Sequence, residues 1–354
     1  MGDLGLRRSV IPIGVGSAIL AAVLFGISTP FAKLLLGDLA PIMLAGLLYL
    51  GSGIGLMALM LVRSVKSEAR LTKKDLPWLG GAILFGGVLA PVLLMNGLLN
   101  TPASSVSLLL NLEGVFTAIL AWFVFHENFD RRIALGMGLI VVGGIVLGWS
   151  NGKFDFPVHS LAIAGACFCW GIDNNLTQKV SASDPFQIAA YKGAVAGAVN
   201  VSLALLLGTR IPSFTIIGNA LLVGFLGYGL SLALFVYSLR YIGTARTGAY
   251  FSLAPFVGAV VSLFLLSEPL NVRLIIAGIF MGIGVWLHLT EKHEHIHEHS
   301  PIEHTHCHIH DAHHHHEHND DVVIREEHTH LHKHERLVHK HLHYPDIHHR
   351  HNHD

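Results

Sequence analysis

LEGVFTAILAWFVFHENF, residues 112–129, occurs a second time in related form, because it aligns without gaps with LAPFVGAVVSLFLLSEPL, residues 253–270. The alignment places Glu127 opposite Glu268. A second pair of segments matches in the same order with one inserted residue: FGISTPFAK (25–33) and WGIDNNLTQK (170–179). The chain is therefore built from two related halves.

The repeated segments are strongly apolar, and so is most of the chain: 52% of its 354 residues are hydrophobic and 13% are charged. A soluble domain carries about 25% charged residues, whereas a helix that crosses a bilayer needs about 20 predominantly apolar residues. We therefore predict an all-α integral membrane protein with ten transmembrane helices. The ten apolar runs lie near residues 12–36, 41–62, 77–98, 103–125, 132–149, 159–179, 186–207, 215–239, 244–267 and 271–290.

Each half holds five of these spans, and an odd number makes the second half enter the membrane with the opposite orientation. The halves are thus inverted repeats, which build transporters with a binding site near the bilayer midplane. The predicted parts are a cytoplasmic N-terminus (1–11), a first repeat (12–149), a loop (150–158), a second repeat (159–290) and a cytoplasmic tail (291–354).

Lys and Arg residues that flank the spans predict the orientation, since cytoplasmic loops carry an excess of them. With the N-terminus in the cytoplasm, the cytoplasmic flanks collect Arg7, Arg8, Arg63, Lys66, Arg70, Lys73, Lys74, Arg131, Arg132, Lys179, Arg240, Arg246 and Lys292. The opposite flanks collect Lys33, Lys153, Arg210 and Arg273. We therefore expect a multi-pass protein of the plasma (cytoplasmic) membrane with both termini in the cytoplasm.

Ten spans, two five-span repeats and a Glu at the end of the fourth and ninth spans resemble the EamA-type family of the drug/metabolite transporter superfamily. LEGVFTAILAWFVFHE is similar to that family's Leu-Glu-Pro-Val-Phe, apolar stretch and Gly-Glu. This chain departs from the pattern at Gly114, His126 and Ser267, whereas Pro255 keeps the proline in the second half. The resemblance covers residues 12–290 and implies export of amino acids, other small metabolites or drugs.

Glu127 and Glu268 end spans at opposite membrane faces and therefore cannot share one site. We expect both to be structural and to fix tight turns by pairing with Arg131, Arg132 or Arg273. Lys33 ends the first span, and we expect it to anchor that helix at the interface.

An ionisable side chain inside a span costs about 2.5–3.5 kcal/mol on insertion scales, so each one is a candidate for function. Glu113, near the middle of the fourth span, could couple transport to protons or attract the positive end of a substrate; packing against a neighbouring helix is the alternative. Lys192 could pair with Asp173 or Glu113, or extend to the interface. The candidate substrate-binding residues are Asn96, Asn111, Glu113, Asp173, Asn174, Lys192, Tyr228 and Tyr250.

Three classes of function remain open. The first is a secondary transporter that exports a small organic solute, such as an amino acid, metabolite or drug-like compound, by alternating access. The second is a transporter of divalent Ni, Co or Zn, and the third is a membrane-anchored metal store without transport. The sequence has no P-loop and no nucleophile with a matching base, so we expect neither an enzyme nor a cofactor requirement. The charge pattern indicates no nucleic-acid partner, and a homodimer is left open.

The tail after Lys292 has His-x-His as its repeating unit. It has too few apolar residues to bury a core, so we expect it to be disordered. Alternate side chains of an extended chain share a face, so neighbouring imidazoles could bind Zn, Ni, Co or Cu and let the tail sense, buffer or gather metal. A pH-responsive charged brush is the alternative. The candidate ligands are His295, His297, His299, His304, His306, Cys307, His308, His310, His313, His314, His315, His316, His318, His328, His330, His332 and His334.

Overall fold

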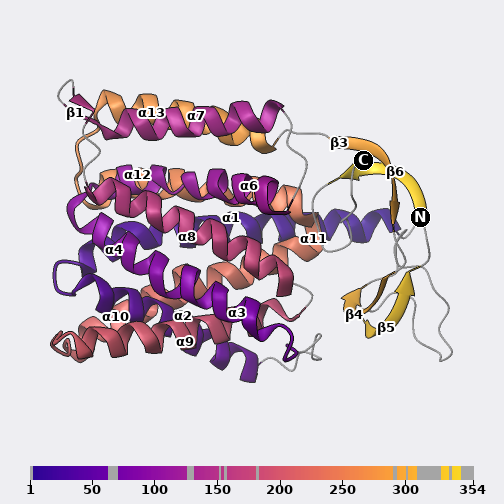
Figure 1. Cartoon of the computed structure of the whole chain (residues 1–354), viewed down its shortest axis with the longest axis horizontal. Helices are drawn as coiled ribbons and strands as arrows, with labels where there is room; N and C mark the ends of the chain where they lie inside the picture. The colour runs from indigo at the N-terminus through magenta and orange to yellow at the C-terminus, as the bar shows by residue number, and fades with distance from the viewer. Residues whose placement is uncertain are drawn as a thin grey trace.

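The structure is a computed structural model of the whole chain. It describes residues 3–62, 71–125, 131–150, 153–154, 158–180, 183–289, 293–299, 302–308, 328–334 and 337–343. The body is a bundle of helices (Figure 1). Long apolar runs form helices in lipid because a helix pairs its own backbone N–H and C=O groups. The predicted all-α membrane fold is confirmed.

The helices of the first half are α1 (Asp3–Leu35), α2 (Pro41–Val62), α3 (Leu76–Ala82), η1 (Ile83–Leu89), α4 (Ala90–Asn100), α5 (Ala103–Leu109), α6 (Leu112–Phe125) and α7 (Arg131–Gly148). Those of the second half are α8 (Val158–Val180), α9 (Pro185–Leu206), α10 (Phe214–Gly224), η2 (Phe225–Leu230), α11 (Ser231–Phe251), α12 (Ala254–Leu265) and α13 (Val272–Leu289). Here η1 and η2 are π-helical. Two short paired strands, β1 (Trp149–Ser150) and β2 (Lys153–Phe154), lie between the halves.

Ten membrane crossings follow from helix length and packing. Among the described residues, seven helical segments are long and apolar enough to cross a membrane, and Ala254–Leu265 and Val272–Leu287 are shorter apolar helices. The tenth crossing is α8, which is 23 residues long but carries Asp173, Asn174 and Asn175. It packs against α4 and α6 inside the bundle. Its polar residues lower its hydropathy, although its position is that of a spanning helix.

The turn between the eighth and ninth spans lies within α11. Residues nine apart in a straight helix are separated by about 13 Å along its axis. In α11, however, Ser238 Oγ and Thr247 Oγ1 are 3.1 Å apart. The ring centroids of Phe235 and Phe251 are likewise 4.9 Å apart. The chain therefore reverses direction between Ser238 and Thr247, at the boundary predicted between these spans.

Contacts between the halves follow a two-fold pattern. The second and seventh spans, α2 and α9, pack on each other, and so do the fifth and tenth, α7 and α13. The third span packs through α4 on α8, and its counterpart, the eighth, packs through α11 on α1. The fourth span contacts α8 through α6, as the ninth contacts α1 through α12. This exchange of equivalent partners is the arrangement expected of two inverted five-helix repeats.

The two halves also interrupt the same spans. The third and eighth spans contain the π-helical segments η1 and η2. The fourth span breaks at Leu110 and Asn111 between α5 and α6, and the ninth breaks at Ser252 and Leu253 before α12. These positions correspond to within one residue in the alignment of the repeats. Interruptions of the regular ladder free backbone groups that must then find partners inside the protein.

Small residues let α2 and α9 approach closely. A β-carbon added to Gly46 or Gly53 in α2, or to Gly193 or Gly197 in α9, would overlap the backbone of the other helix. Close backbone approach is the usual way in which helices associate in lipid, where burial of apolar groups gives no driving force.

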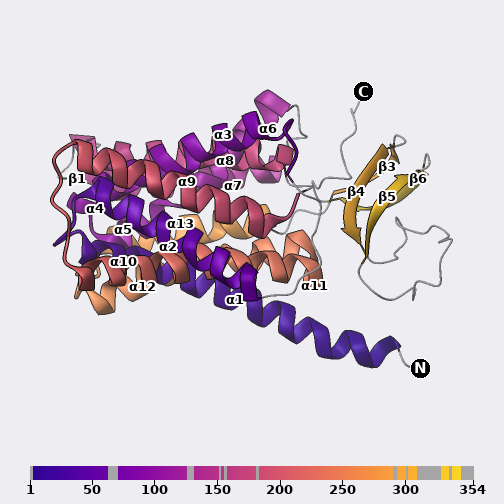
Figure 2. The same cartoon turned by 90° about the horizontal axis from the view of Figure 1, so that it is seen from below.

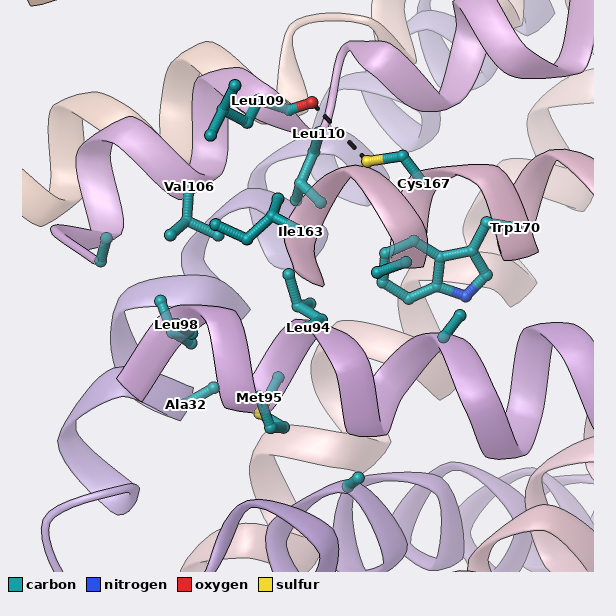
Figure 3. Close-up of a cluster of buried hydrophobic side chains, with 14 of the residues drawn as sticks. Ala32, Leu94, Met95, Leu98, Val106, Leu109, Leu110, Ile163, Cys167 and Trp170 are labelled. Carbon is teal, nitrogen blue, oxygen red and sulfur yellow. Dashed lines mark hydrogen bonds between the residues drawn. The ribbon is translucent and has the colours of Figure 1, made fainter. Parts of the chain in front are cut away.

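A large buried cluster lies where α1, α4, α5 and α8 meet (Figure 3). Ile163 of α8 packs among Leu94 and Val106, and all three are almost completely buried. Cys167 Sγ donates a hydrogen bond of 3.6 Å to the Leu109 carbonyl. This cluster holds α8 firmly, and the polar residues of α8 follow one to two turns further along the helix.

The tail contains four strands, β3 (His293–His299), β4 (Ile302–His308), β5 (His328–His334) and β6 (Leu337–His343). β3 pairs antiparallel with β6, and β4 pairs antiparallel with β5. The alternation of His with other residues in these segments has the period of a strand. Disorder of the tail as a whole stays a prediction. Both ladders lie beyond the end of the bundle at which α1 begins (Figures 1 and 2).

Candidate functional site

Two backbone carbonyls in the middle of the third span, those of Gly86 and Gly87, are bonded by side chains from other helices. Pro91 has no N–H and so removes the donor of one carbonyl in the preceding turn, and the change from π-helical η1 to the α-helix α4 leaves a second carbonyl without its usual donor. Tyr49 Oη from α2 and Trp170 Nε1 from α8 donate to the Gly86 carbonyl at 2.6 and 3.0 Å. The irregular segment η1 is therefore tied to two other helices by side chains.

Asn200 of α9 satisfies the second freed carbonyl. Its Nδ2 donates to the Gly87 carbonyl at 3.1 Å, and the residue is completely buried. Asn200 Oδ1 is buried without a hydrogen-bond partner in the described structure. The amide thus connects the seventh span to the interruption of the third.

An ion pair joins α8 and α9 next to Gly86 of η1. Lys192 Nζ of α9 contacts Asp173 Oδ2 of α8, and Thr177 Oγ1 donates to Asp173 Oδ1 at 3.0 Å. The Lys192 and Asp173 side chains are only 18% and 4% exposed. Both α8 and α9 pack on η1, and Gly86 leaves room for the carboxylate because a β-carbon there would overlap it. Of the partners left open for Lys192 by the sequence, the structure selects Asp173.

Glu113 lies close to this ion pair. It occupies the first turn of α6, where the helix dipole favours a negative charge. Its Oε1 accepts a hydrogen bond of 2.9 Å from Asn174 Nδ2, which also lies 3.1 Å from Thr117 Oγ1. Glu113 is within electrostatic range of both Asp173 and Lys192. Two carboxylates and one ammonium group are thus gathered between α6, α8 and α9.

Aromatic side chains continue from this polar group toward the second half. The Tyr228 ring of η2 lies 5.6 Å from the Tyr49 ring and 5.8 Å from the Phe25 ring, centroid to centroid. Phe25 in turn lies 5.5 Å from Phe251. Tyr49 therefore belongs both to the polar contacts at η1 and to this aromatic row.

The other predicted binding residues lie apart from the ion pair. Asn111 is buried, and its Nδ2 donates to the Leu108 carbonyl at 2.8 Å and approaches Met281 Sδ of α13 at 4.0 Å. Asn96 is exposed and donates to the Val92 carbonyl of its own helix at 2.7 Å. Tyr250 is half-buried near the end of α11.

The sequence did not predict the roles of Tyr49, Thr117, Trp170 and Asn200. Each bonds a group that is near in space but distant in sequence, so no local pattern marks it. The available signal was the pair of glycines shortly before Pro91, because a proline inside a span leaves carbonyls that need donors from other helices.

A family model described as the EamA-like transporter family matches residues 12–149 and 159–290. The chain belongs to the EamA-like transporter family. The two matched ranges are the two five-span repeats, and the histidine-rich tail lies outside them. The family confirms the membrane-transporter fold and the resemblance read from residues 112–129.

Relatives of this EamA-like transporter are themselves described as transporters. An uncharacterized transporter of Methanothermobacter thermautotrophicus is 31% identical over 294 residues, which cover 77% of this chain and 85% of that protein. A probable amino-acid metabolite efflux pump of Salmonella typhimurium is 24% identical over 290 residues, 77% of this chain and 93% of the pump. A crystal structure with 18% identity matches with a TM-score of 0.56 over 80% of this chain and 96% of that one, which is a likeness of fold.

Glu268 of this EamA-like transporter bonds to backbone amides at the start of the fourth span. Its carboxylate accepts hydrogen bonds from the backbone N–H groups of Ala103 at 2.6 Å and Ser104 at 2.9 Å, and so caps the N-terminus of α5. Lys33 Nζ donates to the Leu99 and Thr101 carbonyls at 2.9 and 3.1 Å, at the end of α4. Both side chains hold the turn between the third and fourth spans. Lys33 thus does more than anchor its helix at the interface, and Glu127 lies outside the described residues.

Three strands hold ten of the candidate metal ligands: His295, His297 and His299 in β3, His304, His306 and His308 in β4, and His328, His330, His332 and His334 in β5. Cys307 is in β4, where the register pairs it with Thr329 and places it on the face opposite its neighbouring histidines. In the part of the chain whose side chains are described, no group of three or more His, Cys, Asp or Glu is arranged to hold a metal ion. His310, His313, His314, His315, His316 and His318 lie outside the described residues.

Proposed function

We propose that this protein is a secondary transporter that exports a small zwitterionic solute, an amino acid or a related metabolite or drug-like compound, by alternating access between its two repeats. The observation that carries the proposal is the ion pair Asp173–Lys192 next to Glu113. Charged side chains within spans are costly and mark substrate or ion pathways. These three come from three different spans, the sixth, the seventh and the fourth.

The charges of the group complement those of an amino acid. Lys192 supplies an ammonium that can meet the carboxylate of the solute, while Glu113 is held by the neutral amide of Asn174 and can meet the amino group of the solute. The aromatic row from Tyr49 to Tyr228 offers ring faces on which the positive end or an apolar side chain can rest. The efflux pump of Salmonella typhimurium supports this solute class, since its name refers to amino-acid metabolites.

Alternating access would expose this group to each side in turn as the repeats rock against each other. The interruption of the third span, η1, packs on α8 and α9, which carry Asp173 and Lys192, and η2 interrupts the eighth span in the second repeat. Either a proton or the exchange of a second solute would drive export, and Glu113 is the carboxylate we assign to the coupling step.

The tail belongs to the same proposal as a cytoplasmic metal-binding segment that senses or buffers transition-metal ions. Its strands lie at the same end of the bundle as the start of α1 (Figure 2), as an even number of crossings requires. The distribution of Lys and Arg supports the plasma membrane with this end in the cytoplasm.

Export from cells tests the proposal. Cells expressing the full chain, Glu113→Gln, Lys192→Met, a truncation after Lys292 or Asn219→Ala are compared for metabolites released into the medium and for cell metal content. Asn219 is an exposed polar residue of α10 and serves as the matched control. We expect amino-acid-like solutes to leave cells with the full chain, the truncation and the Asn219 variant, but not with the Glu113 or Lys192 variants. A change of metal content in the Glu113 variant with an unchanged metabolite profile would establish metal as the cargo and overturn the proposal.

A further inference from the structure

The strands of the tail pair histidine with histidine. In the β3–β6 ladder, the facing pairs are His293 with His343, His295 with His341, and His297 with His339. In the β4–β5 ladder, they are His304 with His332, His306 with His330, and His308 with His328. Each ladder therefore contains three consecutive facing pairs at alternate positions.

The pairing assigns these histidines to one face of each ladder. Successive residues of a strand belong to opposite faces, so residues two apart share a face. Seven histidines thus share one face of each ladder: the three facing pairs, with His299 opposite Leu337 in one ladder and His334 opposite Ile302 in the other. The other face holds residues of different character, such as Glu303 paired with Lys333. A slip by one residue would move the histidines of one strand to the opposite face and pair each with a different residue type. The observed register keeps the histidines of both strands on one face.

We infer that each ladder is a binding site for one divalent first-row transition-metal ion, held between two neighbouring facing pairs of histidines. Facing residues of an antiparallel ladder have Cβ atoms about 4.5–5.5 Å apart, and the next facing pair lies about 7 Å along the strand. Two neighbouring pairs therefore supply four imidazoles, the coordination number of a closed zinc site. Imidazole binds Zn, Cu and Ni well.

Metal binding would also stabilise the ladders. An isolated two-stranded sheet is marginally stable in water. In sequence, 19 residues separate β4 from β5, and β3 and β6 are further apart because β4 and β5 lie between them, so pairing has an entropic cost. An ion that bonds to both strands links them directly, and its binding free energy becomes folding free energy of the tail. The inference rests on the proposed metal-binding role of the tail, and it adds which histidines form sites and how many ions they hold.

The test uses full-length protein purified in detergent and dialysed against ZnCl2, with bound zinc per chain measured by elemental analysis. One variant removes two facing pairs of the β4–β5 ladder, by His304→Ser, His306→Ser, His330→Ser and His332→Ser. A matched variant also removes four imidazoles, by His313→Ser, His314→Ser, His315→Ser and His316→Ser. A third adds His295→Ser, His297→Ser, His339→Ser and His341→Ser to the first, and a truncation after Lys292 removes the tail.

We expect two tightly bound ions per chain in the native protein and in the His313–His316 variant, one in the β4–β5 variant and none in the eight-substitution variant. Zinc should also protect the native tail from proteolysis but not that of the eight-substitution variant. If the two four-histidine variants lose equal amounts of zinc, the ladder sites are wrong while the metal-binding tail stands. If truncation after Lys292 leaves zinc binding unchanged, the metal-binding tail and the ladder sites both fail.

Discussion

Gly86 lies so close to Asp173 that a β-carbon at position 86 would overlap the Asp173 carboxylate. The Asp173 carboxylate, which pairs with Lys192, therefore lies against a residue of η1 that has no side chain. At the same residue, the Gly86 carbonyl accepts hydrogen bonds from Tyr49 and Trp170. A single glycine thus positions both the charged and the neutral parts of the candidate site.

Gly86→Ala is expected to abolish export, because the added methyl group must displace Asp173 or separate η1 from α8. Overpacking of this kind costs about 1–3 kcal/mol of stability. Gly80→Ala in the same span is the control, since a β-carbon there meets nothing within 4 Å. Export is measured together with thermal unfolding in detergent, and a Gly86→Ala protein that exports like the native one would show that this contact is irrelevant.

Loss of either partner of the ion pair should strongly destabilise the protein. Lys192→Met or Asp173→Asn leaves the other charge buried without its counter-ion, which costs about 3–5 kcal/mol. The double variant lacks both charges of the pair, so neither is left without its counter-ion, and it should regain most of the unfolding free energy without regaining export. A double-mutant cycle on unfolding and export separates the two effects. Export by the double variant would reduce the pair to a purely structural role.

The hydrogen bond between Asn200 and the Gly87 carbonyl predicts a rescue. Asn200→Leu removes the donor from a buried carbonyl and should lower the unfolding free energy by about 1 kcal/mol. Pro91→Ala restores a backbone N–H to the preceding turn, so it should cost less stability in the Asn200→Leu background than in the native chain. If the losses of unfolding free energy caused by Asn200→Leu and Pro91→Ala simply add in the double variant, Pro91 is not the reason that the Gly87 carbonyl needs a side-chain donor.

Glu268→Ala should lower the stability of the protein by about 0.5–2 kcal/mol, the usual cost of removing a helix N-cap. The reason is that the amides of Ala103 and Ser104 both lose their acceptor. Glu268→Gln keeps one acceptor oxygen and should lose less, which makes it the graded control. Equal melting temperatures for Glu268→Ala and the native protein would disprove the cap.

Labelling of cysteines tests the orientation. Cys307 lies in the tail, whereas Cys167 and Cys169 are buried in the bundle. Ile211, between α9 and α10, is 75% exposed. It follows the seventh crossing, so it should lie on the side of the membrane opposite to both termini. In intact cells an impermeant maleimide should label an Ile211→Cys, Cys307→Ser double variant, and should label Cys307 of the native chain only after permeabilisation. Equal labelling of both in intact cells would contradict the inverted repeat.

The sequence predicted several polar and charged members of the site but not their contacts. Polar groups are rare inside spans, which made four of them recognisable: Glu113, Asp173, Asn174 and Lys192. That Lys192 pairs with Asp173 depends on how α8 and α9 pack against η1, which no local pattern encodes. The strands of the tail were missed for a similar reason, since strand pairing joins segments distant in sequence.

Hydropathy and the internal repeat are sufficient to establish ten crossings in two inverted halves, because lipid requires each crossing to be a long apolar helix that satisfies its own backbone. The meeting of Gly86, Asp173 and Lys192 follows from packing alone. Helices in lipid associate through close steric fit and buried polar contacts between residues far apart in the chain. Those contacts exist only once the bundle has assembled.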